Sequence, residues 1–462
     1  LLLEPSLSWN SEHNSSLISG SIESGMINDR GDMLGEDLRG MPIGDSRYYL
    51  KAQSINQIND NFRIAGLFEK EKDSDVFRDF QRARFSDYQW NDSFGEISYH
   101  HKNWTISSLT RWQSNEYEST IEQMPNIRFD LPPTQLMDSK MYNSLAFEFS
   151  AFREKGHWGQ LLQKSNKFDL GYKIIRPTRL PQGFVFSPHL SYRRQDYSLD
   201  GPNANRSFAE WGNELRYELF GDYDWKNATW KIDQIRHIMG FSIAHRNTKR
   251  IHQSEESLIP KIDQPIYNLN LGSIDLMDQI EADELVPFEI VRIGWENEIL
   301  TRTLNNTKSL ASLDFYQDLY HRKQNQKNQK NEFFSNLSIR PANWISFNGQ
   351  SKIDTEQGKV LRNSFSIWVT DGTINNFQVG YFKYLKFSDQ WRLSGSHLWN
   401  EHLRILGSIS FETDTSEVPF WQTAIEIKSS PMWTWVFSLA RRDGTSKENN
   451  TEFSIGTRIF AF

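Results

Sequence analysis

The stretch Ser207–Phe220, SFAEWGNELRYELF, alternates between apolar and polar side chains along most of its length. The apolar parity consists of Ala209, Trp211, Leu215, Tyr217 and Leu219, with Asn213 as an exception. The opposite parity consists of Glu210, Gly212, Glu214, Arg216 and Glu218. A period of two predicts a β-strand, because successive side chains of a strand point to opposite faces. This strand is far longer than the usual length of about 5–6 residues.

The two faces of this strand favour the wall of a membrane barrel. The strand carries three carboxylates on one face and two large aromatic side chains on the other. A strand in a buried core would tolerate neither feature. In a transmembrane β-barrel, one face meets lipid and the other lines a wet lumen. We therefore expect Glu210, Glu214, Arg216 and Glu218 to face the lumen and the aromatic parity to face lipid.

The composition fits a barrel. The chain has 462 residues, 37% hydrophobic residues and a mean hydropathy of −0.66, and no window approaches the ~20 apolar residues of a membrane-spanning helix. Only alternate residues of a barrel strand need be apolar. The 16 Trp, 16 Tyr and 31 Phe suit aromatic girdles at the two membrane interfaces. An ordinary all-β protein rich in surface Trp is the alternative.

Charge and cysteine content exclude other classes. The net charge of −7 without a dominant basic stripe argues against nucleic-acid binding. The absence of cysteine excludes disulfides and thiolate metal sites. Because the chain starts at Leu1 inside a strand pattern, we expect that an upstream, exported part precedes it.

The same two-faced pattern recurs along the chain. The expected strands are 1–9, 15–24, 46–55, 62–70, 94–101, 104–112, 143–153, 207–220, 362–370, 376–386, 391–398, 403–411, 420–428, 432–441 and 451–462. With weaker candidates there are about 23–25, and bacterial barrels have even strand numbers. The prediction is an all-β protein in which residues 1–462 form one large antiparallel transmembrane β-barrel of about 24–26 strands, with 26 favoured.

Three segments are predicted to be loops. Residues 177–188 and 254–287 each contain three prolines, and residues 322–331 form a polar low-complexity run, RKQNQKNQKN. In the last segment, phosphate binding through Lys323, Lys327 and Lys330 is the alternative to a solvated loop.

Several stretches, in order, resemble one known family. They are Arg47–Leu50 (RYYL), Asp73–Phe80 (DSDVFRDF), Met124–Phe129 (MPNIRF), Ile235–Ile238 (IRHI) and Ile290–Thr303 with the upstream Asp275–Asp278. Together they are similar to the LPS-assembly outer-membrane protein LptD, also called OstA or Imp, from Arg47 to about Thr303. The chain departs from the family after His237, where Ile238–Phe241 replaces a frequent Glu-Pro pair. It also lacks the cysteines of disulfide-controlled maturation.

The resemblance implies a transporter and not an enzyme, with no cofactor. Members of the family form a barrel of 26 strands in the outer membrane of Gram-negative bacteria, with a periplasmic jelly-roll domain upstream. They hold a plug lipoprotein (LptE-like) and receive lipopolysaccharide from a periplasmic bridge protein (LptA-like). They release it into the outer-membrane lipid through a lateral opening.

The resemblance and barrel geometry together locate that lateral gate at the seam, where the first strand meets the last. A closed barrel requires these two strands to pair. The predicted seam residues are Pro5, Leu7, Trp9, Phe453, Ile455 and Ile459. Pro5 has no N–H for the ladder, so this seam should be weak. The alternative is that Pro5 merely begins the strand.

Catalytic and metal motifs are not found in the sequence. The adjacent His100 and His101 would point to opposite faces of a strand, which does not suit a shared metal ligand. A barrel lipase built from Ser and His on one strand face would escape a motif search. A porin or substrate-specific uptake barrel, and a soluble carbohydrate-binding or scaffold β-protein, are the remaining alternatives.

Overall fold

The computed structural model describes residues 2–13, 16–29, 35–37, 40–80, 91–260, 271–279, 285–302, 307–323, 330–385, 388–443 and 450–459. Strands make up nearly all the regular structure of these residues. The helices described are α1 (Val76–Phe80) and the 3-10 helices η1 (His157–Gly159), η2 (Pro181–Gly183), η3 (Glu256–Leu258) and η4 (Leu276–Asp278). Among the described residues, no helix has the length and apolar character needed to cross a membrane.

The first half of the chain contains long strands joined by hairpins. They are β1 (Leu2–Leu3), β2 (Ser6–His13), β3 (Ser16–Asn28), β4 (Ser46–Gln57), β5 (Phe62–Glu71), β6 (Phe94–His100), β7 (Thr105–Arg111), β8 (Thr120–Gln135), β9 (Tyr142–Lys155), β10 (Leu161–Ile175), β11 (Thr178–Arg179), β12 (Val185–Leu199), β13 (Ala204–Asn227) and β14 (Ile232–Gln253).

The second half continues in the same way. It contains β15 (Phe288–Arg302), β16 (Thr307–Lys323), β17 (Glu332–Ala342), β18 (Ile345–Asp354), β19 (Lys359–Asp371), β20 (Asn375–Tyr384), β21 (Ser388–Asn400), β22 (Leu403–Glu412), β23 (Glu417–Ser430), β24 (Trp433–Arg442) and β25 (Asn450–Ile459).

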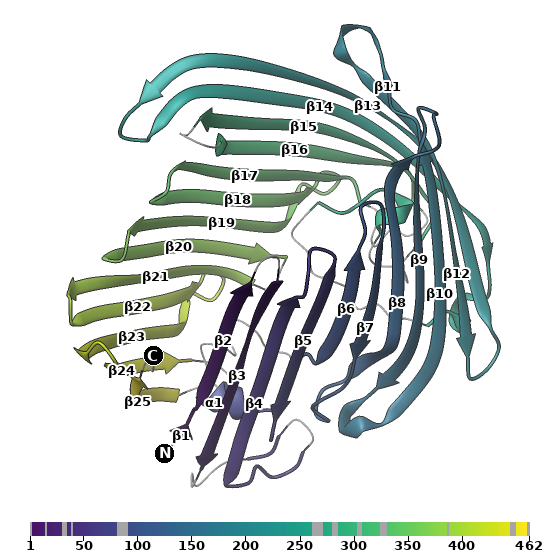
Figure 1. The fold of residues 1–462 in the computed structure, drawn as a ribbon. Coiled ribbons are helices and arrows are strands. Elements are labelled where there is room, and N and C mark those ends of the chain that lie inside the picture. Colours follow the sequence, from purple (N-terminus) through teal and green to yellow (C-terminus); the bar gives the residue numbers. More distant parts are fainter. Residues whose placement is uncertain are drawn as a thin grey trace.

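All these strands belong to one antiparallel sheet that curls into a barrel (Figure 1). Successive long strands pair with each other, and the short β1 and β11 extend the lines of β2 and β10. The described residues contain 25 strand segments, of which β1 and β11 extend other strands, so that 23 are separate strands of the wall. The predicted all-β architecture, a large antiparallel barrel, is confirmed.

The ring is not closed by hydrogen bonds. Within the described residues, β2 pairs with β3 alone and β25 pairs with β24 alone, although Figure 1 shows the two ends of the sheet approaching each other. The predicted strand 1–9 is interrupted at Glu4 and Pro5, between β1 and β2. Pro5 still accepts a hydrogen bond from the amide of Ser24 at 3.1 Å, so the break affects only its donor side.

Two of the three predicted loops, 177–188 and 322–331, need correction at their ends. Pro188 lies inside β12, where its carbonyl accepts a hydrogen bond from the amide of Arg176 at 3.0 Å. Arg322 and Lys323 continue β16, whereas Lys327 lies outside the described residues. Residues 254–287 contain no strand where they are described before Phe288, as predicted, but part of this loop packs against the sheet.

The strand β8 was not predicted in full because it contains three prolines. Its pairing with β9 skips from Gln123 to Asn126 and from Leu131 to Thr134. Both gaps coincide with prolines, which cannot donate to the ladder and are tolerated at bulges. The sequence pattern is therefore broken where the strand itself continues.

Candidate functional site

The most extensive buried polar network joins the inner face of β10–β15 to one short loop segment. We call this segment, residues 273–279, the strap; it contains η4 and belongs to the long connection between β14 and β15. Within it, η4 contacts β10 and β12 of the curved sheet. The strand residues that face it, the strap wall, are Asp169, Lys173, His189, Arg193, Glu210, Glu214 and Arg246.

Strand alternation brings these charged residues to one face. Along β12, His189, Ser191, Arg193 and Gln195 are buried, whereas the intervening Leu190 is 65% exposed. Along β13, Glu210 is buried and the next residue, Trp211, is exposed. The strap therefore covers the polar parity and leaves the apolar parity uncovered. This is the reverse of an ordinary soluble sheet, which buries its apolar face.

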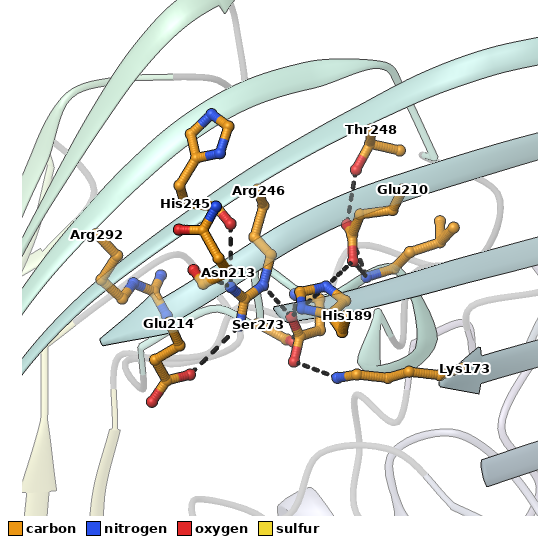
Figure 2. A network of polar contacts seen from close by, with 12 residues as sticks. Lys173, His189, Glu210, Asn213, Glu214, His245, Arg246, Thr248, Ser273 and Arg292 are labelled. Carbon is orange, nitrogen blue, oxygen red and sulfur yellow. Dashed lines mark hydrogen bonds and ion pairs between the residues drawn. The ribbon is translucent and has the colours of Figure 1, made fainter. Parts of the chain in front are cut away.

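Asp275 is the centre of the strap's electrostatic contacts, and Figure 2 labels its neighbours Lys173, His189 and Arg246. Its carboxylate accepts a hydrogen bond from Lys173 Nζ at 2.9 Å and another from Arg246 Nε, and His189 Nε2 lies 3.9 Å away. Burial alone would raise the pKa of Asp275, but the charges of Lys173 and Arg246 outweigh it and lower the pKa to about 2. Asp275 is therefore an anion at neutral pH.

Glu210 holds the strap from the opposite side of the same network. It is 2% exposed, and it accepts hydrogen bonds from Thr248 Oγ1 at 2.7 Å and from the backbone amide of Leu276 at 3.1 Å. His189 Nε2 lies 3.1 Å from its carboxylate. The amide of Leu276 would otherwise be a buried donor without a partner, which is costly.

A second buried group supports the end of the strap. Arg193 donates to both carboxylate oxygens of Asp169, at 3.0 and 2.8 Å. Its remaining guanidinium nitrogen donates to the carbonyls of Leu276 and Gln279, at 3.1 Å each. One arginine thus connects β10, β12 and the strap. Beside it, a pocket of about 440 Å³ separates the strap from β8–β10.

Apolar side chains of the strap also pack on the sheet. Leu276 is fully buried and clusters with Phe208 and Leu285. Ile274 clusters with Ala244, Phe288 and Ile290. Burying one such side chain contributes about 1.5–3 kcal/mol, so the strap is held by apolar packing as well as by charge.

Two mid-strand glycines allow close approaches at this site, Gly171 to the strap and Gly212 to neighbouring residues of the strap wall. A Cβ atom on Gly171 would lie 2.5 Å from Sδ of Met277. A Cβ atom on Gly212 would lie 2.5 Å from Cε1 of His189 and 2.6 Å from the carbonyl oxygen of His245. Glycine inside a strand often marks such a close approach. These glycines are the sequence signal that could have indicated the strap.

His189, Glu210 and Asp275 have the composition of a metal site, since their donor atoms lie within 4.8 Å of one another. The donor set does not fit a metal, however, because Lys173, Arg246 and Thr248 already satisfy the carboxylates. The network can hold a segment or exchange an anion.

The predicted lumen residues lie on the strap side of β13. Glu210 and Glu214 belong to the network, and Glu214 lies 3.4 Å from Arg246. Arg216 pairs with Glu296 at 2.8 Å, and Glu218 is exposed further along the strand. The four residues share one face, and their assignment to a lumen stays a prediction. Sequence reasoning missed Lys173, His189 and Arg246.

The predicted seam residues lie along the two unpaired edges. Leu7 and Trp9 on β2 are exposed, and so are Phe453 and Ile455 on β25. The side chain of Ile459 lies outside the described residues. No hydrogen bond is described between β2 and β25, and the assignment of these residues to a lateral gate stays a prediction.

The inner face near the seam differs from the strap wall. We call it the open wall, and its residues are Asn348, Gln350, Ser364, Ser366, Gln378, Ser394, Ser396, Leu406, Ser408, Gln422 and Ser438. Two pockets of about 400 and 360 Å³ lie on it, both lined by strand residues. Their charged residues are Glu426 and Arg458, which pair at 2.9 Å.

Two stretches that resemble the LptD family also meet in space. Arg47 of β4 donates to both carboxylate oxygens of Asp73, at 3.0 and 2.8 Å, and to Asp79 of α1 at 2.9 Å. Tyr49 stacks near Phe77, with ring centroids 4.7 Å apart. The arginine of the first stretch therefore fixes the second stretch at one end of the barrel.

Comparison with known proteins adds structural neighbours. Neither a family model nor a curated protein matches the chain. The ferric-catecholate import receptor Fiu from E. coli K12 matches with a TM-score of 0.35 and 9% identity, over 99% of this chain and 78% of its own. The alcaligin outer membrane receptor FauA from Bordetella pertussis matches with a TM-score of 0.34 and 7% identity, over 99% and 75%.

A mutant of Rh. blastica porin matches with a TM-score of 0.23 and 12% identity, over 64% of this chain and 90% of its own. TM-scores this low carry no argument about this chain. The class therefore rests on the strand pairing: the protein is a large antiparallel β-barrel with a charged, partly filled inner face and an unpaired seam.

Proposed function

We propose that the protein is an outer-membrane translocon that inserts lipopolysaccharide into the outer leaflet through a lateral opening between β2 and β25. The observation that carries this proposal is the pair of unpaired strand edges, one on each side of the same gap. Exposed strand edges are normally covered or blocked. Here both edges belong to the two ends of one barrel, where an opening would connect its inside to the membrane.

The two faces of the barrel suit an amphipathic cargo. The outer parity carries exposed apolar side chains on many strands: Leu190, Trp211, Ile243, Trp295, Trp391, Ile409, Ile425, Trp435 and Phe453. These residues fit a lipid environment, and we propose an outer-membrane location for the barrel. The inner parity near the seam is polar and small. A sugar head group could stay hydrated there while acyl chains pass through the gap into lipid.

The proposed partners follow from the resemblance to the LptD family and from barrel width. A barrel of this many strands has a lumen too wide for its own side chains to fill. We expect a plug lipoprotein in the lumen, a periplasmic bridge protein that delivers lipopolysaccharide, and no enzymatic activity. Isolation of the intact barrel from its native membrane should bring down a small lipoprotein.

Cysteine cross-linking tests the opening directly, because the chain has no native cysteine. A pair across the gap, L7C with I455C, should stop delivery of lipopolysaccharide to the cell surface when oxidised and restore it when reduced. The matched control is F437C with I455C, since Phe437 and Ile455 are already partners in the β24–β25 pair. Normal export by a fully cross-linked L7C/I455C barrel would overturn the proposal.

A porin or uptake barrel is the second candidate, favoured by the two pockets of the open wall, where the charged residues are confined to the Glu426–Arg458 pair. Such a channel should conduct ions when reconstituted alone and should conduct equally well with the seam cross-linked. A translocon should lose export under the same cross-link. Conductance and surface delivery, measured on one L7C/I455C sample, separate the two functions.

A further inference from the structure

The carboxylate of Asp275 lies in a cationic site that strand residues form and the strap does not. We call this site, made by Lys173, His189 and Arg246, the seat. Lys173 comes from β10, His189 from β12 and Arg246 from β14, and Figure 2 shows the three converging on one point. Among the described residues, Asp275 is the only group that accepts a hydrogen bond from Lys173. If the strap left, the ammonium of Lys173 would lose this partner.

The position of Arg246 does not depend on the strap. Its guanidinium donates to the backbone carbonyls of Asn213 and His245, at 3.1 and 3.0 Å, and lies 3.4 Å from Glu214. These contacts come from β13 and β14. The seat would therefore keep its shape with Asp275 removed, and it would then present Lys173 and Arg246 to the lumen.

A phosphate group carries more negative charge than a carboxylate and has three acceptor oxygens. Lys173 Nζ and Arg246 Nε both donate to Asp275, and both would donate to a phosphate in its place. His189 Nε2 lies 3.9 Å from Asp275 and 3.1 Å from Glu210, so the imidazole lies at the edge of the seat. A phosphate-bearing ligand could therefore compete with Asp275 for the same donors.

We propose that Lys173, His189 and Arg246 form a binding site for a phosphate group, and that Asp275 is its internal occupant. On this proposal the strap is a displaceable plug: a phosphate-bearing ligand takes the seat and releases the strap from the wall. The phosphate comes from a glycolipid head group or from free phosphate. The glycolipid source rests on the proposed function, whereas the exchange of one anion for another does not.

Trapping of the strap by a disulfide measures its position. The double variant G171C/M277C places two thiols where the strap meets β10, and removal of the Met277 side chain makes room for the new Cβ. The yield of disulfide after a short oxidation reports the seated strap. It is compared, at equal ionic strength, in chloride, in inorganic phosphate, with micelles of a phosphorylated glycolipid, and with the same glycolipid after removal of its phosphates.

The expected result is a several-fold lower yield with phosphate groups than in chloride or with the dephosphorylated glycolipid. A decrease with the phosphorylated glycolipid supports a head-group ligand, and a decrease with inorganic phosphate alone supports a free-phosphate site. Equal yields in all four conditions, or equal yields for the two glycolipids without any effect of inorganic phosphate, overturn the proposal.

Two variants in the same cysteine background show where the ligand acts. D275N should lower the yield even in chloride, because a neutral amide holds Lys173 and Arg246 less well. K173Q should reduce the response to phosphate while the strap remains partly seated by Glu210 and Leu276. The matched control D222N removes the exposed pair with Arg236 at 2.7 Å, on neighbouring strands away from the strap, and should respond as the parent does.

The outcome is separable from that of the seam experiment. Strap release by phosphate together with normal export through a cross-linked seam would overturn the translocon proposal and support the phosphate site. Blocked export together with a strap that ignores phosphate would do the reverse. A phosphate response that K173Q leaves unchanged would also overturn the assigned residues.

Discussion

The strap wall and the open wall are two inner faces of one sheet, made by the same alternation of side chains, yet they differ in what covers them. On β10–β15, charged residues are buried beneath a loop segment that pairs with them. On β18–β24, serine, asparagine and glutamine line pockets that strand residues alone surround. The first wall has an internal ligand, and the second has room for an external one.

This difference teaches that a polar inner parity does not by itself define a channel. Buried ions such as Asp169 and Arg193 are costly unless they are paired, and here the carboxylates of Asp169 and Asp275 both have cationic donors. Seryl and amide side chains need no fixed partner when water reaches them. The strap wall is therefore suited to one specific occupant, whereas the open wall is suited to a moving cargo.

The largest expected effect is on packing at the strap. Leu276→Ala removes a fully buried side chain between the strap and Phe208, and we expect a loss of about 2–5 kcal/mol in the free energy of unfolding. The control is Leu406→Ala on the open wall, where the side chain lines a pocket and its loss should cost much less. Folding titrations in lipid vesicles measure both; equal losses would mean that the strap is not a packed element.

The next largest effect is the cost of placing lysine on the outward-facing side of the strands. It tests the assignment of faces on the strap wall and on the open wall together. Lysine at a lipid-facing position near the bilayer midplane costs about 2–4 kcal/mol. We expect this cost for Leu215→Lys behind the strap wall and for Ile409→Lys behind the open wall. The inward-facing neighbours should differ from each other. Ser408→Lys should cost little free energy of folding. Glu214→Lys should cost more than Ser408→Lys, because the new lysine faces Arg246, but less than Leu215→Lys.

The same folding titrations measure these four variants. Equal penalties for Leu215→Lys and Glu214→Lys would contradict the assignment of faces on the strap wall. Equal penalties for Ile409→Lys and Ser408→Lys would contradict it on the open wall.

Backbone spacing gives a smaller contrast between the walls. Gly212→Ala would place its Cβ 2.6 Å from the carbonyl oxygen of His245, which cannot move without disturbing the ladder, so we expect a loss of about 1–3 kcal/mol. Gly380→Ala on the inner side of β20 meets nothing closer than 3.9 Å and should be neutral or slightly stabilising. Thermal unfolding in one detergent compares them, and a neutral Gly212→Ala would show that the strap wall can relax.

The sequence predicted those parts of the fold that depend on local alternation. The expected strand 403–411 is β22 (Leu403–Glu412), and the expected strands 362–370 and 376–386 are β19 and β20, which Asp371-Gly372 connects with Gly372 at a φ of +56°. Alternation alone did not predict strand β8, because prolines at its bulges interrupt the pattern without ending the strand. At the seam the prediction was a paired but weak junction, whereas β2 and β25 are not paired in the described residues.

The strap could not be predicted from local pattern because its contacts are far apart in the sequence. Lys173 and Asp275 are separated by 102 positions, and neither lies in a recognisable motif of a site. The run 254–287 has the composition of a loop, and composition says nothing about whether a loop docks on a wall. Gly171 and Gly212 indicate a close approach but do not identify what approaches.

The smallest expected effect is the response of the strap to pH, and its near absence is informative. Because Lys173 and Arg246 lower the pKa of Asp275 to about 2, below the unfolded value of about 3.9, its ionised form stabilises the seated strap. This contribution is fully present above pH ~4 and is lost only as the pH falls through ~2. The strap should therefore stay on its wall from about pH 5 to 8, and the ion conductance of the barrel in planar bilayers should not change over this range.

Asp275→Asn provides the control, since it removes this titration and should remain insensitive in acid as well. A conductance change centred between about pH 6 and 7 in the parent would contradict the prediction, because the Asp275 carboxylate stays ionised throughout that range. It would mean that another group, and not the Asp275 carboxylate, decides whether the strap stays on its wall.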